Sequence, residues 1–160
     1  MRKEGSLKKG IYIALAFLWV YACSVSIVSA AFKLPSYVFR ADQLGEAQDK
    51  AKSTNAPIVF LYTDEDTNCG LATAASLDAI QEFKDNCVII YIASGKEKEA
   101  WTKIPRIVRS AIKSFEAGRF ISKCIIVNPE ITKVISIIPY TSDGKERKEI
   151  LRRVHSTILR

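Results

Sequence analysis

The sequence contains few of the residue types on which most enzyme and metal sites depend. Among its 160 residues there is one histidine, His155, and there are four cysteines. A single histidine cannot form a zinc site with scattered cysteines, and four cysteines are too few for a small disulfide-stapled scaffold. No P-loop, GxGxxG motif or Ser-His-Asp set is present, so we expect neither a metal nor a cofactor. His155 is expected to be a packing residue at a surface or core boundary.

The sequence also lacks low-complexity stretches and internal repeats. Its hydrophobic fraction of 48% and charged fraction of 26% are normal for a folded chain, which argues against disorder. A length of 160 residues favours one domain, with or without a targeting segment. We therefore expect a single globular domain.

Charge is missing from a long stretch near the N-terminus. Residues 1–10 carry four cations and one anion, and the run from Ile11 to Ala31 carries no charge at all. A basic start, an apolar run and the small residues Val28-Ser29-Ala30 are typical of a secretory signal that is cut after Ala30. Residues 1–30 are thus predicted to be a signal peptide or a membrane anchor.

Three fates of this segment stay open. It is cleaved, or residues 11–31 remain as a membrane-spanning anchor with the basic end in the cytoplasm. Alternatively, Val20-Tyr21-Ala22-Cys23 resembles a bacterial lipobox, in which Cys23 would carry a lipid. Each fate takes the rest of the chain out of the cytoplasm, so the protein is expected to be periplasmic, secreted or membrane-anchored.

Most of the basic excess belongs to this leader. Residues 31–160 hold 20 basic and 16 acidic residues, so their net charge is 20 − 16 = +4 against +7 for the whole chain. Nucleic acid is therefore not expected as a partner. Arg106, Arg109 and Lys113 lie at helical spacing, and further cations crowd the last predicted helix. We interpret both as solvated helix faces, with anionic lipid or polysaccharide as the alternative.

Hydrophobic patterning predicts alternating strands and helices after residue 36. Apolar runs without alternation predict buried strands at Ile58–Tyr62, Cys87–Ile92 and Cys124–Val127, and Val134–Ile138 is predicted to return as a hairpin. Tyr37–Phe39 could form a brief edge strand. Helices are predicted from Asp42, over Leu71–Phe83, from Ile104 to Gly118, and from Asp143 to Leu159. The predicted inner faces of the second and third helices include Leu71 and Leu77, and Phe115, respectively. The order (β)αβαβαββα predicts an α/β three-layer sandwich.

Two segments within residues 36–160 resemble secreted thioredoxin-like proteins. Glu46-Ala47 and Ala51-Lys52, followed by Pro57–Tyr62, are similar to the Ala-rich helix and the proline-led apolar strand of those families. Ile121–Glu130 is similar to their fourth strand and the turn after it. The resemblance implies the thioredoxin fold, as one domain over residues 36–160.

The motif that carries thioredoxin chemistry is absent. Thioredoxins carry Cys-x-x-Cys about ten residues after the proline that opens the second strand. Counting from Pro57 places Thr67 and Gly70 at the two cysteine positions, and a shift of one residue recovers only Cys69, as the second cysteine. The position of the family's cis-proline is taken by Ser122. Dithiol exchange needs both an attacking and a resolving thiol, so we do not expect an ordinary reductase or oxidase.

The remaining cysteines allow two interpretations. In the fold that the resemblance implies, the loop after the second strand lies beside the start of the fourth, so Cys69 and Cys124 could form a structural disulfide. Alternatively, both are ordinary free thiols. Cys87 is expected to be inert and buried.

The sequence therefore leads to one main functional expectation and two alternatives. The main one is an exported, non-catalytic binding or structural module that meets a protein or peptide partner. The loops expected to form its substrate-facing edge contain Thr67, Asn68 and Gly70 on one side and Ile121, Ser122 and Lys123 on the other. The first alternative is a thiol-disulfide enzyme that acts through Cys69 alone. The second is an envelope protein held in the membrane by residues 11–31.

Overall fold

The computed structural model describes residues 33–64, 66–95 and 101–159. The predicted leader, including Cys23 and Ala30, lies outside these residues. Residues 31–160 form a compact unit of their own. Within the described ranges, no helix combines the length and the apolar character that crossing a bilayer requires.

The observed elements follow the predicted order. They are β1 (Phe39–Arg40), the short 3-10 helix η1 (Ala41–Gln43), α2 (Leu44–Thr54), β2 (Ile58–Thr63), α3 (Gly70–Phe83), β3 (Val88–Ala93), α5 (Arg106–Ile112), β4 (Lys123–Val127), β5 (Val134–Ile138) and α6 (Gly144–Ile158). The order βαβαβαββα is thereby confirmed, including the brief first strand and the terminal hairpin.

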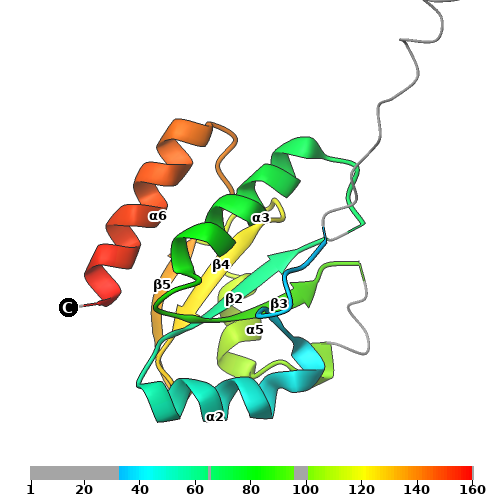
Figure 1. Cartoon of the computed structure of the whole chain (residues 1–160). Coiled ribbons are helices and arrows are strands. Elements are labelled where there is room, and N and C mark those ends of the chain that lie inside the picture. Colours follow the sequence, from blue (N-terminus) through cyan, green and yellow to red (C-terminus); the bar gives the residue numbers. More distant parts are fainter. Residues whose placement is uncertain (1–32, 65, 96–100, 160) are drawn as a thin grey trace, which may run out of the picture. The chain divides into compact units, whose positions relative to one another are not determined.

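The strands form one mixed sheet in the order β1-β3-β2-β4-β5. The first three strands of this order are parallel, whereas β4 runs antiparallel to β2 and β5 antiparallel to β4. In the central strand, Phe60 lies opposite Ile90 of β3 and Ile125 of β4. The apolar runs without alternation belong to these three inner strands, which are covered on both faces (Figure 1).

Two separate cores lie on the two faces of the sheet. Ile58, Phe60 and Tyr62 of β2 pack with α2 and α5, while Val59 and Leu61 point to the other side and pack with α3 and α6. This alternation follows from the two-residue repeat of a strand. The described residues thus form three layers, with the sheet in the middle (Figure 1).

The inner face of α3 differs from the prediction. Leu71 and Leu77, expected on the buried stripe, are 55% and 47% exposed. The buried positions are held mostly by small side chains: Ala72, Ala75, Ser76, Ala79, Ile80 and Phe83. Small residues let the helix approach the sheet closely, and Ser76 makes hydrogen bonds there, so packing rather than side-chain size decided which face is buried.

The helix predicted to run from Ile104 to Gly118 is shorter than expected. α5 ends at Ile112, and Phe115, expected on its inner stripe, is fully exposed. The carbonyl groups of Ile112 and Gly118 accept hydrogen bonds from Lys123 Nζ, at 3.4 and 2.7 Å. These bonds and the left-handed conformation of Gly118 (φ 68°) form a loop where the helical pattern would have continued.

Candidate functional site

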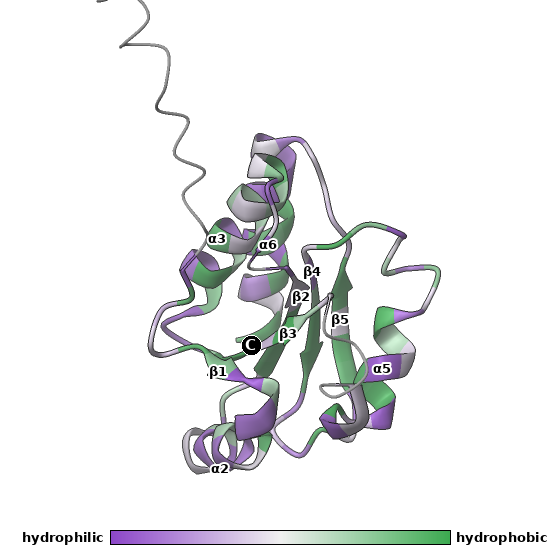
Figure 2. Cartoon of the chain, turned by 90° about the vertical axis from the view of Figure 1, so that its right-hand side faces the viewer, coloured by the Kyte–Doolittle hydropathy of each residue, from purple (hydrophilic) through white to green (hydrophobic). Residues whose placement is uncertain are grey.

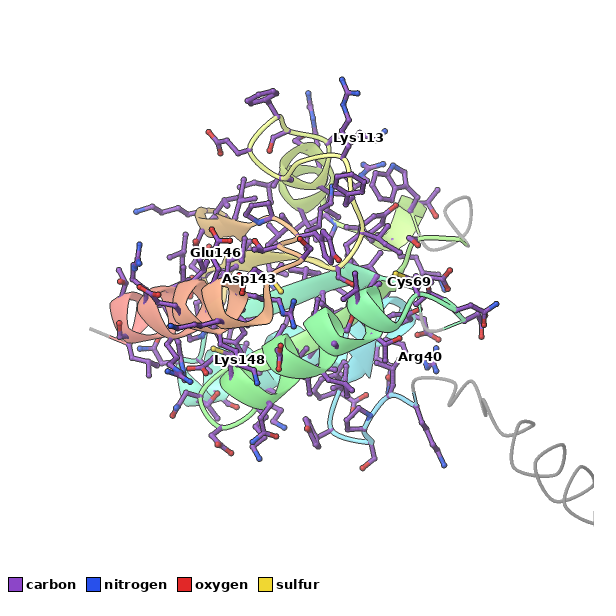
Figure 3. The ribbon with its side chains drawn as sticks, turned by 90° about the horizontal axis from the view of Figure 1, so that it is seen from above. Arg40, Cys69, Lys113, Asp143, Glu146 and Lys148 are labelled. Carbon is purple, nitrogen blue, oxygen red and sulfur yellow. The ribbon has the colours of Figure 1, made fainter. Side chains whose placement is uncertain are left out.

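Cys69 lies at the N-terminus of α3 and is exposed to solvent. It is the N-cap residue: its carbonyl group accepts the first helical hydrogen bond from Thr73, at 3.0 Å. Its backbone N–H donates to Oγ1 of Thr67, at 3.2 Å. Figure 3 shows Cys69 at the start of the helix, on the outside of the molecule. An electrophile in solution can therefore reach this sulfur directly.

The residue that follows Cys69 by three positions is Ala72, and it lies on the inner side of the first helical turn. Ala72 is 3% exposed. Residues three apart on a helix are neighbours on its surface. The start of α3 therefore presents one thiol to solvent and, one turn later, a methyl group to the interior.

A cluster of three buried hydroxyl groups lies beneath this turn. Thr63 at the end of β2, Ser76 in α3 and Ser122 before β4 are each buried. The Oγ1 of Thr63 is 2.8 Å from Oγ of Ser122 and 2.9 Å from Oγ of Ser76, and the two serine oxygens are 3.1 Å apart. Both serines also donate to the carbonyl group of Ala72, at 2.9 Å. Each hydroxyl has partners, as buried polar groups require.

The sequence points to only one member of this cluster, Ser122, which takes the position of the family's cis-proline. Thr63 and Ser76 are not among the residues that the sequence predicts for a site. The available signals were a threonine that ends an apolar strand and a serine on the inner side of an Ala-rich helix. Neither signal says that the two hydroxyls meet, because the residues are thirteen positions apart and lie on different elements.

Ser122 has a left-handed backbone conformation, with φ 67°, and no peptide bond among the described residues is cis. A non-glycine residue in this region costs about 1 kcal/mol or more. The conformation is held by the hydroxyl cluster and by the backbone N–H of Ser122, which donates to the carbonyl group of Tyr62 at 3.0 Å. The segment before β4 is thereby fixed against both the end of β2 and the first turn of α3.

The structure places the second predicted edge segment beside the first turn of α3, and it buries part of that segment. Oγ of Ser122 donates to the carbonyl group of Ala72, which lies two positions after Gly70. Asn68 and Gly70 are exposed, and Thr67 and Ile121 are half-buried.

Lys123, also expected at this edge, is buried instead. It lies opposite Tyr62 in the sheet, on the face that packs with α5. Its ammonium group is 5.9 Å from the centre of the Tyr62 ring. Burial lowers the pKa of Lys123 from its usual value of 10.5. This side chain is part of the core and is not available to a partner at the Cys69 edge.

All three cysteines in the described part of the chain are free, so the structure contains no Cys69–Cys124 bond. Cys124 is 3% exposed and packs in the core beneath α3 and α6. Burial raises the pKa of the Cys124 thiol to about 12, and burial likewise raises the pKa of the half-buried Cys87 to about 12. Both thiols are therefore protonated at neutral pH, and Cys69 is the exposed one.

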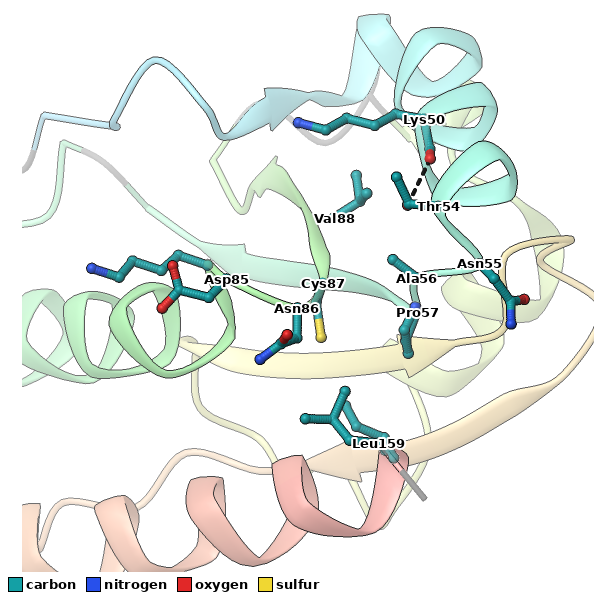
Figure 4. Close-up of a pocket in the computed structure, with 12 residues that line it drawn as sticks. Lys50, Thr54, Asn55, Ala56, Pro57, Asp85, Asn86, Cys87, Val88 and Leu159 are labelled. Carbon is teal, nitrogen blue, oxygen red and sulfur yellow. Dashed lines mark hydrogen bonds between the residues drawn. The ribbon is translucent and has the colours of Figure 1, made fainter.

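Cys87 lines a separate pocket of about 610 Å³ at the other end of the sheet. The pocket lies beside the first residue of β2, whereas the hydroxyl cluster lies at its last. Pro57, Asn86 and Leu159 are among its lining residues, which come from the ends of α2, α3 and α6 (Figure 4). The protonated Cys87 thiol is a poor nucleophile, since the thiolate is the reactive form.

His155 packs as expected from its position beside an apolar stripe. Its Nδ1 is 2.9 Å from Oε1 of Glu82, and its ring meets the ring of Phe83 edge-on, with the centroids 5.3 Å apart. Among the residues that the structure describes, no three His, Cys, Asp or Glu side chains are grouped so that they could hold a metal ion.

Comparison with known proteins gives no family for the chain. No protein-family model matches it, and no curated protein matches it.

Proposed function

We propose that the protein is an exported thioredoxin-like domain without dithiol catalysis, which binds a protein or peptide at the start of α3. The sheet order β1-β3-β2-β4-β5, with β4 antiparallel to its neighbours, supports the thioredoxin-like assignment. Ser122, at the position where that family has its cis-proline, departs from the family, because no described peptide bond is cis. The apolar run at residues 11–31 supports export.

The position of Cys69 supports a different alignment with the family motif from the one that counting suggested. The motif begins at the N-terminus of the helix, and the N-cap residue here is Cys69. The motif then aligns with Cys69-Gly70-Leu71-Ala72, so that Ala72 takes the second cysteine position. On this alignment the protein keeps the attacking thiol and lacks the resolving one.

The observation that carries the proposal is the exposed start of α3, which lies on a base of three buried hydroxyl groups that all have hydrogen-bond partners. The hydroxyl groups of Thr63, Ser76 and Ser122 fix the base, and none of them can resolve a mixed disulfide. Above it, Leu71 is 55% exposed beside Cys69. An exposed leucine at a helix N-terminus, where the first N–H groups have no partner within the helix itself, can hold an apolar side chain and a peptide carbonyl group at the same time.

Two exposed leucines on the same helix allow a matched test. Leu71→Glu should weaken binding to an immobilised, reduced and carboxymethylated protein by about tenfold or more, the effect of losing one central contact. Leu77→Glu makes the same change about two turns away and should leave binding unchanged. Surface plasmon resonance measures both. Equal binding by the wild type and Leu71→Glu would remove α3 as the binding site.

Thiol exchange through Cys69 alone is the second candidate function, because this thiol is exposed at a helix N-terminus. Its thiolate would attack a disulfide, form a mixed disulfide and release the other sulfur as a thiolate. A thiol such as glutathione would then attack the mixed disulfide, taking the substrate half and restoring the Cys69 thiolate.

Cys69→Ser distinguishes the two functions. A binding module should keep its affinity for the unfolded protein when Cys69 is replaced, because serine preserves the size of the side chain. A thiol enzyme should lose turnover of a glutathione mixed disulfide completely. Turnover by the wild type, lost in Cys69→Ser, would favour the enzyme; unchanged peptide binding without any turnover would favour the binding module.

A further inference from the structure

The net positive charge of residues 31–160 comes from one segment. Residues 101–121 hold five cations and one anion, 5 − 1 = +4, and the rest of residues 31–160 hold 15 of each sign, 15 − 15 = 0. The five cations are Lys103, Arg106, Arg109, Lys113 and Arg119. The segment comprises residues 101–105, α5 and the loop after it, and its cations have one anion among them.

The same segment carries the two most exposed large hydrophobic side chains of the described residues. Phe115 is 101% exposed and Phe120 is 71% exposed. The ring of Phe120 lies 6.0 Å from the ring of Tyr140, and Lys113 Nζ lies 5.0 Å above the ring of Trp101. Aromatic rings and cations thus both belong to this surface.

The loop that presents Phe115 is held in place by contacts within the protein. Ala117 is fully buried, and its N–H donates to Oγ of Ser114. The N–H of Gly118 donates to the carbonyl group of Phe115 at 3.1 Å, and Lys123 Nζ donates to the carbonyl group of Gly118. These hydrogen bonds fix the turn so that Phe115 points into solvent. Such exposure is unusual for a phenylalanine side chain that packs against no partner.

We propose that α5 and residues 113–120 form a surface that docks on an anionic lipid bilayer. Cations with few anions between them match anionic headgroups, and outward aromatic rings insert at the boundary between headgroups and acyl chains. The cations of α6 differ, because three of its five are in ion pairs: Arg147 and Lys148 with Asp78 of α3, and Arg153 with Glu149. Figure 2 shows α5 on the side of the sheet away from α6, and Figure 3 shows Lys113 far from Lys148.

This surface is independent of the proposed peptide site and of the fate of the leader. If residues 11–31 remain in the membrane, seven residues, 32–38, lie between Ala31 and Phe39, the first residue of β1, so the chain covers 39 − 31 = 8 steps. Such a linker spans at most about 28 Å, so the domain would stay close to the bilayer. If the leader is removed, the surface would itself bring the protein to the membrane.

Vesicle sedimentation tests the proposal on residues 31–160, which form a compact unit with both faces of the sheet covered. Binding to phosphatidylcholine vesicles that contain phosphatidylglycerol should exceed binding to phosphatidylcholine alone and should fall with added salt. Each cation near an anionic surface contributes about 1 kcal/mol, a factor of about five. The double variant Lys113→Gln/Arg119→Gln should therefore bind about 25-fold more weakly, and Phe115→Ser about tenfold.

Matched controls remove the same groups elsewhere. Lys145→Gln/Arg152→Gln removes two exposed charges from α6, and Leu77→Ala removes an exposed apolar side chain from α3. Both should bind like the wild type. The proposal would be overturned if the two charge variants lost binding equally, or if the vesicles showed no preference for phosphatidylglycerol. Binding to soluble heparin as strong as binding to the vesicles, or self-association through Phe115, would overturn it as well.

A second measurement uses the full chain and does not require the isolated unit to fold. With Trp19→Phe, Trp101 is the one remaining tryptophan of the two in the sequence. Brominated phosphatidylglycerol in the vesicles should quench its fluorescence, and Lys113→Gln/Arg119→Gln should reduce the quenching. Quenching that is the same in both proteins would contradict docking through this surface.

Discussion

At the scale of single residues, Lys123 departs furthest from what its type predicts. It is 4% exposed and lies on a strand, where its ammonium group meets the carbonyl groups of Ile112 and Gly118 and the ring of Tyr62. Burial disfavours the charged form of an amine. The residue serves to end α5 and to fix the loop that follows, at a cost in desolvation.

That cost predicts a pH dependence of stability. The pKa of Lys123 is lowered on folding from 10.5, so between the folded value and 10.5 the unfolded chain binds more protons than the folded one. Stability therefore rises with pH in this window, with a slope of at most about 1.4 kcal/mol per pH unit for one proton. The free energy of unfolding of the wild type should rise relative to that of Lys123→Met as the pH approaches 10.5.

Urea unfolding at a series of alkaline pH values measures this difference. Lys133→Met, which removes an exposed ammonium group, controls for the loss of a charge by itself. A constant difference between the wild type and Lys123→Met at all pH values would show that burial does not lower the pKa.

At the scale of elements, α3 and α6 are joined by a polar contact as well as by apolar packing. Oδ2 of Asp78 accepts hydrogen bonds from Nε and Nη2 of Arg147, at 2.9 and 2.6 Å. Nη1 of Arg147 donates to the carbonyl group of Thr141, at 2.9 Å. α6 begins as predicted, because the Asp143 carboxylate accepts from the N–H groups of Lys145 and Glu146. The cap fixes where the helix starts, and the ion pair fixes how it lies on α3.

We expect the Asp78–Arg147 pair to contribute about 2 kcal/mol, because its hydrogen bonds involve charged groups and Arg147 is buried. A double-mutant cycle with Asp78→Ala and Arg147→Ala measures the coupling by urea unfolding. The exposed pair Glu149–Arg153 on α6 is the control, with an expected coupling of about 0.5 kcal/mol or less. Similar couplings in both cycles would mean that burial adds nothing to the first pair.

At the scale of the whole molecule, the two ends of the sheet and its two faces carry different chemistry. The end at Thr63 has the exposed Cys69 and the hydroxyl cluster, and the end at Ile58 has the pocket beside Cys87. The segment with α5, residues 101–121, carries a net charge of 5 − 1 = +4. The Cys69 end and the pocket beside Cys87 are separated by the length of β2, so that a change in one of these two should leave the other intact.

The proposed alignment of Cys69 with the attacking cysteine predicts a gain of function. Ala72→Cys should place a second thiol one helical turn from Cys69, and the pair should form a disulfide, seen as a loss of two hydrogens in the intact mass. The variant should then reduce insulin with dithiothreitol faster than the wild type does. Asp66→Cys, which completes a Cys-x-x-Cys motif ending at Cys69 in the alignment shifted by one residue, is the control and should not. A gain in Asp66→Cys alone would contradict the proposed alignment.

The sequence was sufficient for the element order because that order depends on local patterning. Apolar runs such as Ile58–Tyr62 and caps such as Asp143 act over a few residues, and the structure has them where they were predicted. The faces of the helices were predicted less well. Leu71, Leu77 and Phe115 were expected inside and are exposed, since an apolar stripe on a short helix does not specify which part of it meets the sheet.

The candidate site divides in the same way. The sequence alone establishes the lone Cys69 near the motif position, the missing cysteine pair, the charge balance and the apolar run that predicts export. All of these depend on residue identity and local spacing. Only the tertiary structure decided that Cys69 caps α3, that Thr63, Ser76 and Ser122 meet beneath it, and that Lys123 turns inward. These contacts join residues far apart in the chain, and their partners are selected by packing across the sheet, which no local pattern encodes.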